Sequence, residues 1–175
     1  MPSRRNFLRA AAGATVYRLA EAAPSPVPAA ALAPSDTLNI GQIGVGIRGS
    51  QLMDEFSRIP GVNLAMAADL YDGYLQHARE FLQDKVRTTK HYEDVLSDKS
   101  IDAVIIATPD HWHKKMTLDA LSAGKHVYIE KPMTWSVEEG PEIIAAEKRS
   151  GKVVMVGSGG KTTTLVAKCR ELVTQ

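Results

Sequence analysis

The stretch Ile43-Gly44-Val45-Gly46-Ile47-Arg48-Gly49 decides the fold of this chain. It follows the apolar run 38–43 and precedes the helix-like segment 50–56. Its glycines have the spacing G-x-G-x-x-G: the first permits a tight turn, the second lets a pyrophosphate approach the backbone, and the third lets the helix pack against its strand. Free N–H groups at the start of that helix would bind the phosphates. The pattern predicts a strand, a turn and a helix that bind a dinucleotide.

An acidic residue favours this interpretation over a tight strand-to-helix loop with no ligand. A second apolar run, 62–68, ends at Asp69. That residue lies about 20 positions beyond Gly49, where this kind of fold places a carboxylate for the ribose hydroxyls of adenosine. Three glycines alone can occur in a turn by chance, so the prediction of dinucleotide binding depends on the combination with Asp69.

From Thr37 onward, strand-like and helix-like runs alternate along the chain. We expect strands at 38–43, 62–68, 89–92, 102–108, 125–129 and 153–156. We expect helices at 50–56, 71–83, 93–96, 111–123, 136–149 and 163–172, with Asp110 and Ser136 as N-caps. This alternation predicts an α/β fold: a doubly wound parallel sheet of the Rossmann type, as a single domain after an N-terminal tail.

Length and composition exclude several other classes of protein. The chain has 175 residues, a formal net charge of +1, one cysteine and 44% hydrophobic residues. This length allows one globular domain and a tail. The balanced charge gives no reason to expect a nucleic-acid partner, and no apolar run reaches the roughly 18 residues that a membrane-spanning helix needs. Cys169 cannot form an internal disulfide, because it has no second cysteine.

Residues 1–35 differ from the rest in being rich in Ala, Pro and Ser after a basic start. The segment around Arg4-Arg5 resembles a twin-arginine export signal, although Arg18 and Glu21 interrupt the part that should be apolar. Because of the paired arginines, we predict export to the periplasm. The alternative is a disordered tail on a cytoplasmic protein.

Two further stretches carry polar groups at predicted strand ends. Glu130-Lys131-Pro132 follows one strand, and Thr108 to Lys115 follows the preceding one. Side chains at the carboxyl ends of parallel strands meet at the edge where open α/β sheets bind ligands. A lysine there can donate to a substrate oxygen, while the alternative is a solvated loop. His111 and His113 are two residues apart and do not share a helix face, so we predict no metal site.

A second glycine-rich turn, Gly157 to Thr162, could indicate a nucleoside triphosphate loop. In the pattern G-x-x-x-x-G-K-[ST] the first glycine would fall on Met155, inside a predicted strand. The pattern fails by position, so we do not predict binding of ATP or GTP.

Taken together, four motifs resemble the glucose-fructose oxidoreductase and inositol dehydrogenase (Gfo/Idh/MocA) family. They are the glycine turn with Asp69, the segment 107–113, the helix end 123–127, and the segment 130–133. The resemblance implies a domain that binds NAD, with NADP as the alternative, and a sugar-like or polyol-like substrate for hydride transfer. It implies Lys131 as the active-site lysine. The cofactor-binding residues that we expect are Gly44, Gly46, Ile47, Arg48, Gly49, Asp69, Thr108, Pro109, His113, Glu130, Lys131 and Pro132.

Family members continue into a second α/β domain that binds the substrate and supplies an acid/base histidine and an aspartate. We therefore expect the dinucleotide-binding domain at 36–157, the start of a truncated substrate domain at 158–175, and little turnover from these residues alone. Whether the chain acts as an enzyme stays open. A non-catalytic dinucleotide-binding or sensing module is the alternative function, and a homo-oligomer is an open alternative for its assembly.

Overall fold

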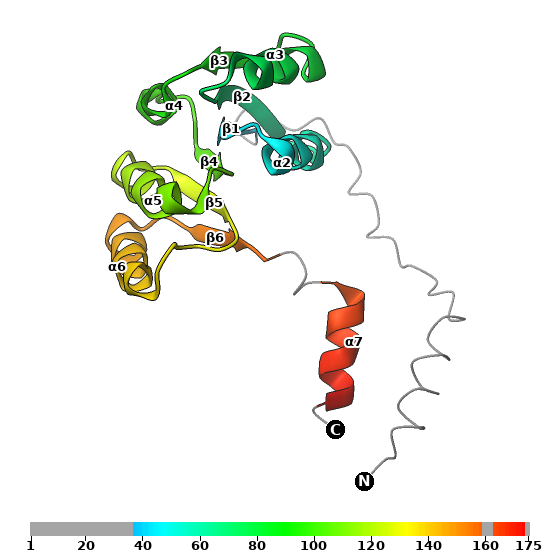
Figure 1. Cartoon of the computed structure of the whole chain (residues 1–175), viewed down its shortest axis with the longest axis vertical. Coiled ribbons are helices and arrows are strands. Elements are labelled where there is room, and N and C mark those ends of the chain that lie inside the picture. The colour runs from blue at the N-terminus through cyan, green and yellow to red at the C-terminus, as the bar shows by residue number, and fades with distance from the viewer. Residues whose placement is uncertain (1–36, 159–162, 174–175) are drawn as a thin grey trace, which may run out of the picture. The chain divides into compact units, whose positions relative to one another are not determined.

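The computed structural model describes residues 37–158 and 163–173 (Figure 1). The predicted export signal at 1–35 lies outside these residues, as do residues 159–162 of the second glycine-rich turn. Within the described part of the chain, no helix is both long and apolar enough to span a membrane.

Six parallel strands form one sheet in the order β3-β2-β1-β4-β5-β6. The strands are β1 (Leu38–Ile43), β2 (Val62–Ala68), β3 (Arg87–Thr89), β4 (Ala103–Ile106), β5 (His126–Glu130) and β6 (Val154–Gly157). The prediction of a doubly wound parallel sheet is confirmed. The strand order reverses between β1 and β4, and ligands of such sheets bind at the carboxyl end of this reversal.

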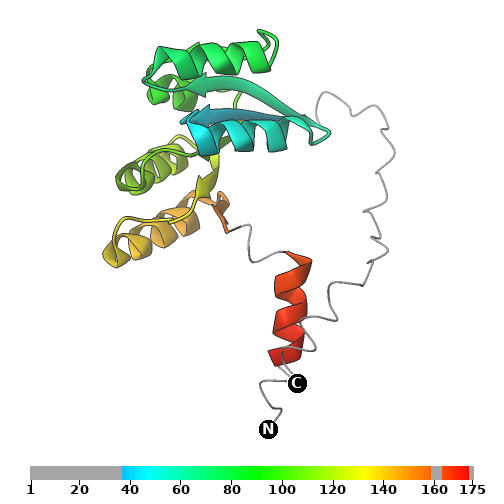
Figure 2. The same cartoon turned by 45° about the vertical axis from the view of Figure 1, so that its right-hand side comes forward.

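The helices connect the strands in the predicted alternation. They are α2 (Ile47–Ser57), α3 (Asp72–Phe81), α4 (Tyr92–Ser97), α5 (His113–Ser122) and α6 (Gly140–Ser150), with α7 (Thr164–Val173) after the last strand. Two 3-10 turns, η2 (Asp110–Trp112) and η3 (Val137–Glu139), precede α5 and α6. From β1 the chain passes through the glycine turn directly into α2 (Figure 2).

The predicted capping residues behave differently from each other. Ser136 forms a reciprocal capping box with Glu139, as its position before Val137 predicts. The Asp110 side chain makes no cap for a helix at 111–123: Asp110–Trp112 is a 3-10 turn, and α5 begins at His113. The prediction was wrong here because the chain after Pro109 first makes a 3-10 turn, in which the Trp112 N–H donates to the Pro109 carbonyl oxygen at 2.9 Å.

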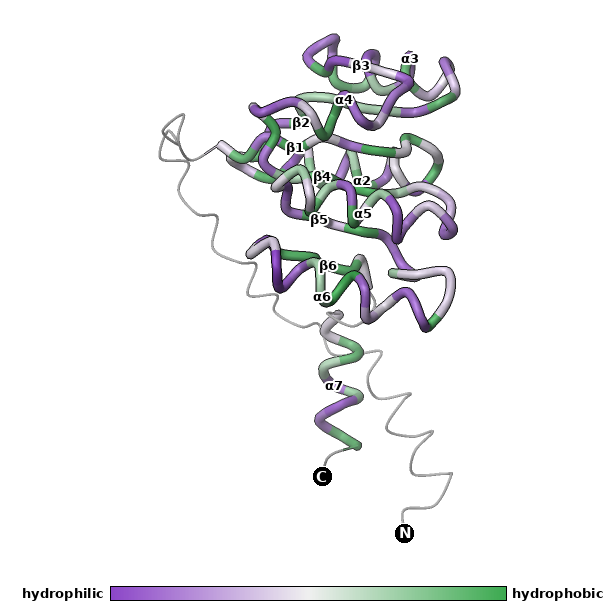
Figure 3. Tube along the Cα trace, turned by 90° about the vertical axis from the view of Figure 1, so that its left-hand side faces the viewer, coloured by the Kyte–Doolittle hydropathy of each residue, from purple (hydrophilic) through white to green (hydrophobic). Residues whose placement is uncertain are grey.

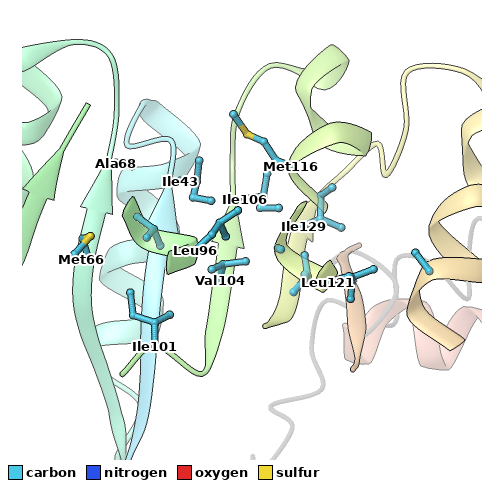
Figure 4. Close-up of a cluster of buried hydrophobic side chains, with 14 residues drawn as sticks. Ile43, Met66, Ala68, Leu96, Ile101, Val104, Ile106, Met116, Leu121 and Ile129 are labelled. Atoms are coloured by element: carbon cyan, nitrogen blue, oxygen red, sulfur yellow. The ribbon is translucent and has the colours of Figure 1, made fainter. Parts of the chain in front are cut away.

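Two apolar clusters cover the two faces of the sheet. On one face, Leu52 and Met53 of α2 and Ala78 of α3 pack against β1, β2 and β4. On the other, residues of α4, α5 and α6 pack against β1, β2, β4 and β5 (Figure 4). Each fully buried Leu or Ile side chain contributes roughly 1.5–3 kcal/mol of hydrophobic free energy. These clusters hold β1 and β4 side by side, and thereby set the edge at which the site is built.

Candidate dinucleotide-binding site

Gly44 makes the turn at the end of β1. Its φ is +90°, a conformation that side chains rarely adopt, and a Cβ atom at this position would lie 2.5 Å from the Ala107 carbonyl oxygen. The Gly44 N–H donates to the Ala68 carbonyl oxygen at 2.8 Å. Only glycine therefore lets the turn lie between the ends of β2 and β4.

Gly46 stands in open space at the N-terminus of α2. Its φ of −61° suits any residue, and an added Cβ atom would meet only a Tyr74 ring carbon at 3.9 Å. The first N–H groups of a helix have no acceptor within it, and no acidic residue stands in the first turn of α2. The missing side chain at Gly46 thus leaves room for a ligand directly at a positive helix end.

Gly49 brings α2 close to the turn. An added Cβ atom would collide with the Gly44 carbonyl oxygen. The same contact is braced by Gln42, a buried β1 residue whose Nε2 donates to the carbonyl oxygens of Gly44 at 3.0 Å and Gly49 at 2.7 Å. The three glycines thus have three different environments: a tight turn at Gly44, open space at Gly46 and a close helix contact at Gly49.

Gln42 is a residue that the sequence reasoning missed. A glutamine inside an otherwise apolar buried strand was a usable signal, because a buried amide must find hydrogen-bond partners. Which partners it would find could not be read from the strand alone, since Gly49 belongs to the following helix.

Asp69 lies against the glycine turn. Its Oδ2 accepts a hydrogen bond from the Val45 N–H at 2.8 Å, and its Oδ1 accepts one from the Tyr71 N–H at 3.0 Å. Each carboxylate oxygen has a further lone pair for another donor. The carboxylate at the end of β2 is therefore fixed in place beside the turn and can still receive two hydroxyl groups.

Glu130 and Arg48 connect the turn to the end of β5. Arg48 Nε donates to Glu130 Oε1 at 2.7 Å, and Glu130 is 5% exposed. The hydrogen bond to Glu130 raises the pKa of Arg48 above its ordinary value, against the opposing effect of burial. Burial and the charge of Glu130 likewise raise the pKa of the neighbouring Tyr128. A charged pair thus joins the start of α2 to the strand that leads to Lys131.

Lys131 and Pro132 follow this pair on an exposed loop at the same edge. The Lys131 N–H donates to Glu130 Oε2 at 3.0 Å, and the Lys131–Pro132 peptide bond is cis. Glu130 therefore fixes the lysine main chain, while the lysine side chain stays accessible to a ligand.

His113 is buried, with 1% of its surface exposed. Its Nδ1 lies 2.6 Å from the Pro132 carbonyl oxygen and its Nε2 lies 2.9 Å from the Thr108 carbonyl oxygen. His113 joins the loops that follow β4 and β5 and has no exposed surface to offer a cofactor.

The remaining predicted residues lie at the same edge. The Ile47 side chain is exposed in the first turn of α2, and Pro109 ends the loop after β4. Thr108 Oγ1 donates to the Met116 sulfur at 3.6 Å. The structure therefore gathers the predicted residues at one edge, around the reversal between β1 and β4. Among the described residues, no three His, Cys, Asp or Glu side chains form a group that could hold a metal ion.

A hollow of about 490 Å³ lies at the opposite edge of the sheet, away from the glycine turn. Lys99, Asp102, Lys125, His126 and Lys152 are among the residues that line it. The Lys125 ammonium donates to the carbonyl oxygens of Asp98 and Ile101, both at 2.7 Å. The buried cation of this hollow is already engaged with the main chain, which counts against a ligand site there.

Comparison with known proteins places the chain among dinucleotide-binding proteins. A family model described as an oxidoreductase family with an NAD-binding Rossmann fold (Gfo/Idh/MocA) matches residues 38–158. The chain is 32% identical to a glycosyl hydrolase family 109 protein of Shewanella baltica, over 87% of the chain and 38% of the relative. It is also 32% identical to an α-N-acetylgalactosaminidase of Shewanella oneidensis, over 69% of the chain and 28% of that protein.

Solved structures include proteins with a similar fold. The myo-inositol 2-dehydrogenase of Lactobacillus plantarum superposes with a TM-score of 0.73 at 26% identity, over 79% of the chain and 41% of that protein. The chain thus spans less than half the length of each of these proteins.

Proposed function

Because the chain belongs to the Gfo/Idh/MocA oxidoreductase family and contains its NAD-binding Rossmann domain, we propose that the protein transfers hydride between NAD and a hydroxyl-bearing carbon of a sugar-like or polyol-like substrate. The observation that carries the proposal is the glycine turn, in which a tight turn, an open helix end and a close helix contact occur at the three spaced glycines. Bound NAD would supply the hydride acceptor, and the residues of this chain would bind and orient it.

We assign the pyrophosphate to the open helix end at Gly46 and the adenosine ribose to Asp69. Asp69 also sets the choice between NAD and NADP, because its fixed carboxylate would repel the 2′-phosphate of NADP at close range. The exposed apolar side chains of Ile47, Leu70 and Tyr71 flank this position and suit the faces of an adenine ring.

The preference for NAD can be measured by titrating NADH and NADPH against the chain, followed by nicotinamide fluorescence. We expect NADH to bind at least about tenfold more tightly, because like charges placed together cost several kcal/mol. Asp69→Asn keeps a hydrogen-bond acceptor but removes the charge, so the affinities for NADH and NADPH should become more similar. Equal affinities in the wild type would remove Asp69 from this role.

Lys131 is the residue that we propose to touch the substrate. An ammonium group at this loop can donate to the oxygen that gains or loses charge in the reaction. The reaction also needs a positioned proton acceptor, which we assign to the substrate-binding part of the protein. In a form of the protein that turns over substrate, Lys131→Met should lower kcat far more than it lowers NADH affinity. Unchanged turnover would contradict the assignment.

The names of the two curated relatives favour a second candidate, a nicotinamide-dependent glycosidase. Such enzymes depart from the usual mechanism with two carboxylates, so they can use the same dinucleotide-binding domain. Two assays separate the candidates. An oxidoreductase accumulates NADH from inositols or sugars. A glycosidase releases p-nitrophenol from p-nitrophenyl N-acetyl-α-galactosaminide only when NAD is present, without net NADH. Dinucleotide binding with neither activity would support the alternative of a sensing module.

A further inference from the structure

None of the described residues covers one part of the sheet on the face that carries α2 and α3. Tyr128 of β5 is paired with Met155 of β6, so both side chains point to this face, and Val153 follows by the alternation of an extended chain. The Tyr128 ring packs edge-on against Phe56 of α2, with 5.3 Å between ring centroids. Beyond Tyr128, Val153 and Met155 are each 58% exposed. We call Tyr128, Val153 and Met155 the open β6 face.

The other face of β6 is already occupied. Val154 and Val156 pack against the cluster that includes Ala146 of α6 and Leu121 of α5. Any further element that covers β6 must therefore lie on the open β6 face, beside α2.

Helix α7 has an apolar stripe of its own. Its members are Leu165, Val166, Cys169, Leu172 and Val173. At 100° per residue these positions fall within a sector of about 120°, with Cys169 near its middle. Lys168 and Glu171 lie outside the sector, and the tube in Figure 3 shows hydrophobic and hydrophilic residues alternating along α7. None of its described residues is buried.

Both surfaces have a physical reason to be covered. An isolated helix of ten residues is marginal in water, and most helices gain their stability by packing an apolar face. A β-strand at the edge of a sheet with exposed apolar side chains is a site for unwanted association. Burying either surface against the other removes both problems.

The connection between them is short enough to allow this packing. β6 ends at Gly157 and α7 begins at Thr164, which leaves residues 158–163 as the connection. Six residues can reach up to roughly 20 Å, whereas a helix axis lies only about 10 Å from a sheet that it covers. Connections of this length are usual between a strand and the helix that packs back on its sheet.

We propose that α7 packs its apolar stripe, centred on Cys169, on the open β6 face of the same chain. The helix then completes the cover of the sheet beside α2. This packing is independent of cofactor binding and of the proposed reaction.

The cysteine content of the chain provides a direct test. Cys169 is the only cysteine in the sequence, so Met155→Cys creates a chain with two cysteines. Oxidation with diamide, followed by intact mass and non-reducing electrophoresis, should show an intramolecular disulfide between positions 155 and 169. The matched control is Ile144→Cys, an exposed apolar position on α6 over the opposite face. We expect the Met155→Cys chain to close at least about tenfold faster, because docking raises the effective concentration of the two thiols.

Each other outcome would overturn the proposal. Equal rates for the two variants would mean that α7 moves as a free tether. Disulfide-linked dimers in place of the internal bond would mean that a second copy covers the face, with the wild-type chain showing the background from Cys169 alone. No bond in either variant would mean that α7 lies elsewhere.

A second pair of variants tests the stripe itself. In the Met155→Cys background, Leu172→Ser removes an apolar side chain from the stripe, whereas Ala167→Ser adds the same residue on the opposite side of the helix. Disulfide formation should slow about tenfold with Leu172→Ser and stay unchanged with Ala167→Ser. Equal slowing by both would indicate loss of the helix, not loss of packing, and would count against the stripe. Because Met155 is mostly exposed, its replacement should leave the sheet folded, which circular dichroism checks.

Discussion

The two edges of the sheet both carry charged residues, but they use them differently. At the carboxyl edge, Asp69 and Glu130 are held by N–H and guanidinium groups around an open helix end. At the amino edge, Asp102 accepts from the Asn39 N–H, and the buried Lys125 donates to two carbonyl oxygens. The charges of the amino edge stabilise the strand ends, whereas those of the carboxyl edge surround a space left free of side chains.

This difference shows why the hollow at the amino edge is not the better candidate for the site. The hollow at the amino edge has a volume of about 490 Å³. Its buried ammonium group, that of Lys125, already donates hydrogen bonds to two main-chain carbonyl oxygens. The carboxyl edge has the positive end of α2 and a glycine where a side chain would stand in the way. Unmet hydrogen-bonding capacity indicates a ligand site more reliably than volume does.

The largest effect should come from Gly44→Ala at the carboxyl edge. The new methyl group meets the Ala107 carbonyl oxygen at 2.5 Å, and the backbone needs a φ of +90°. We expect a loss of roughly 3 kcal/mol in the free energy of unfolding, from strain and overpacking, together with weaker NADH binding. Urea unfolding and NADH titration measure the two effects.

Gly151→Ala is the matched control for this variant. Gly151 also has a positive φ, of +65°, but an added Cβ atom meets nothing within 4 Å. Gly151→Ala should lower the free energy of unfolding by about 1 kcal/mol through backbone strain alone, with NADH affinity unchanged. Equal losses in the two variants would show that the close approach of Gly44 to β4 is unimportant.

At the amino edge, Lys125→Met should lower the free energy of unfolding without changing NADH binding. It removes a charged donor and leaves the Asp98 and Ile101 carbonyl oxygens without that partner, which costs about 2 kcal/mol. NADH affinity should stay within about twofold of the wild type, since distant sites act independently. Lys152→Met, in the same hollow, should change stability by less than about 0.5 kcal/mol. A large fall in NADH affinity with Lys125→Met would mean that the amino edge also contributes to dinucleotide binding, which would contradict the difference between the two edges.

A smaller effect is expected from His113→Leu. The substitution leaves the Thr108 and Pro132 carbonyl oxygens without the ring, and the lost hydrogen bonds should lower the free energy of unfolding by about 1–2 kcal/mol. It should also weaken NADH binding a few-fold, because the loops after β4 and β5 lose their connection. His111→Leu, at an exposed position in the same segment, is the control and should change neither quantity. If both histidine variants bind NADH like the wild type, His113 does not position the site.

The smallest effect concerns acid stability near the amino edge. Hydrogen bonds from the Ser100 hydroxyl and N–H, together with Arg87, hold the pKa of Asp98 well below its ordinary value. A carboxyl group with a lowered pKa adds stability above its unfolded pKa of about 4, and this is lost as the pH falls towards the folded pKa. The unfolding midpoint of the wild type should therefore exceed that of Asp98→Asn at pH 6, and the difference should shrink below about pH 4. A difference that does not change with pH would contradict this cause.

Most of the fold could be predicted because its signals are local. Largely apolar runs marked five of the six strands, all except β3, and Gly44, Gly46 and Gly49 lie in one turn whose geometry follows from their spacing. Boundaries were less predictable: the strand expected at 89–92 lies at Arg87–Thr89, where it pairs with β2.

The connections within the site could not be predicted in the same way. Arg48 and Glu130 are 82 positions apart, and they meet only because the sheet order carries the chain from β1 through β4 to β5. The bridge from His113 to Pro132 likewise depends on β4 and β5 being neighbours. Strand order is a property of the whole sheet, so no single segment reveals these contacts.

Binding of a nicotinamide dinucleotide at the carboxyl edge is tested most directly by one comparison of NADH affinities. Gly46→Ala adds a methyl group into open space, so its unfolding midpoint should equal that of the wild type. Its NADH affinity should fall at least about tenfold, because the methyl group stands where the pyrophosphate approaches. Lys152→Met, at the opposite edge, should bind NADH like the wild type. Wild-type affinity in Gly46→Ala, or lost affinity in Lys152→Met, would contradict binding at the carboxyl edge.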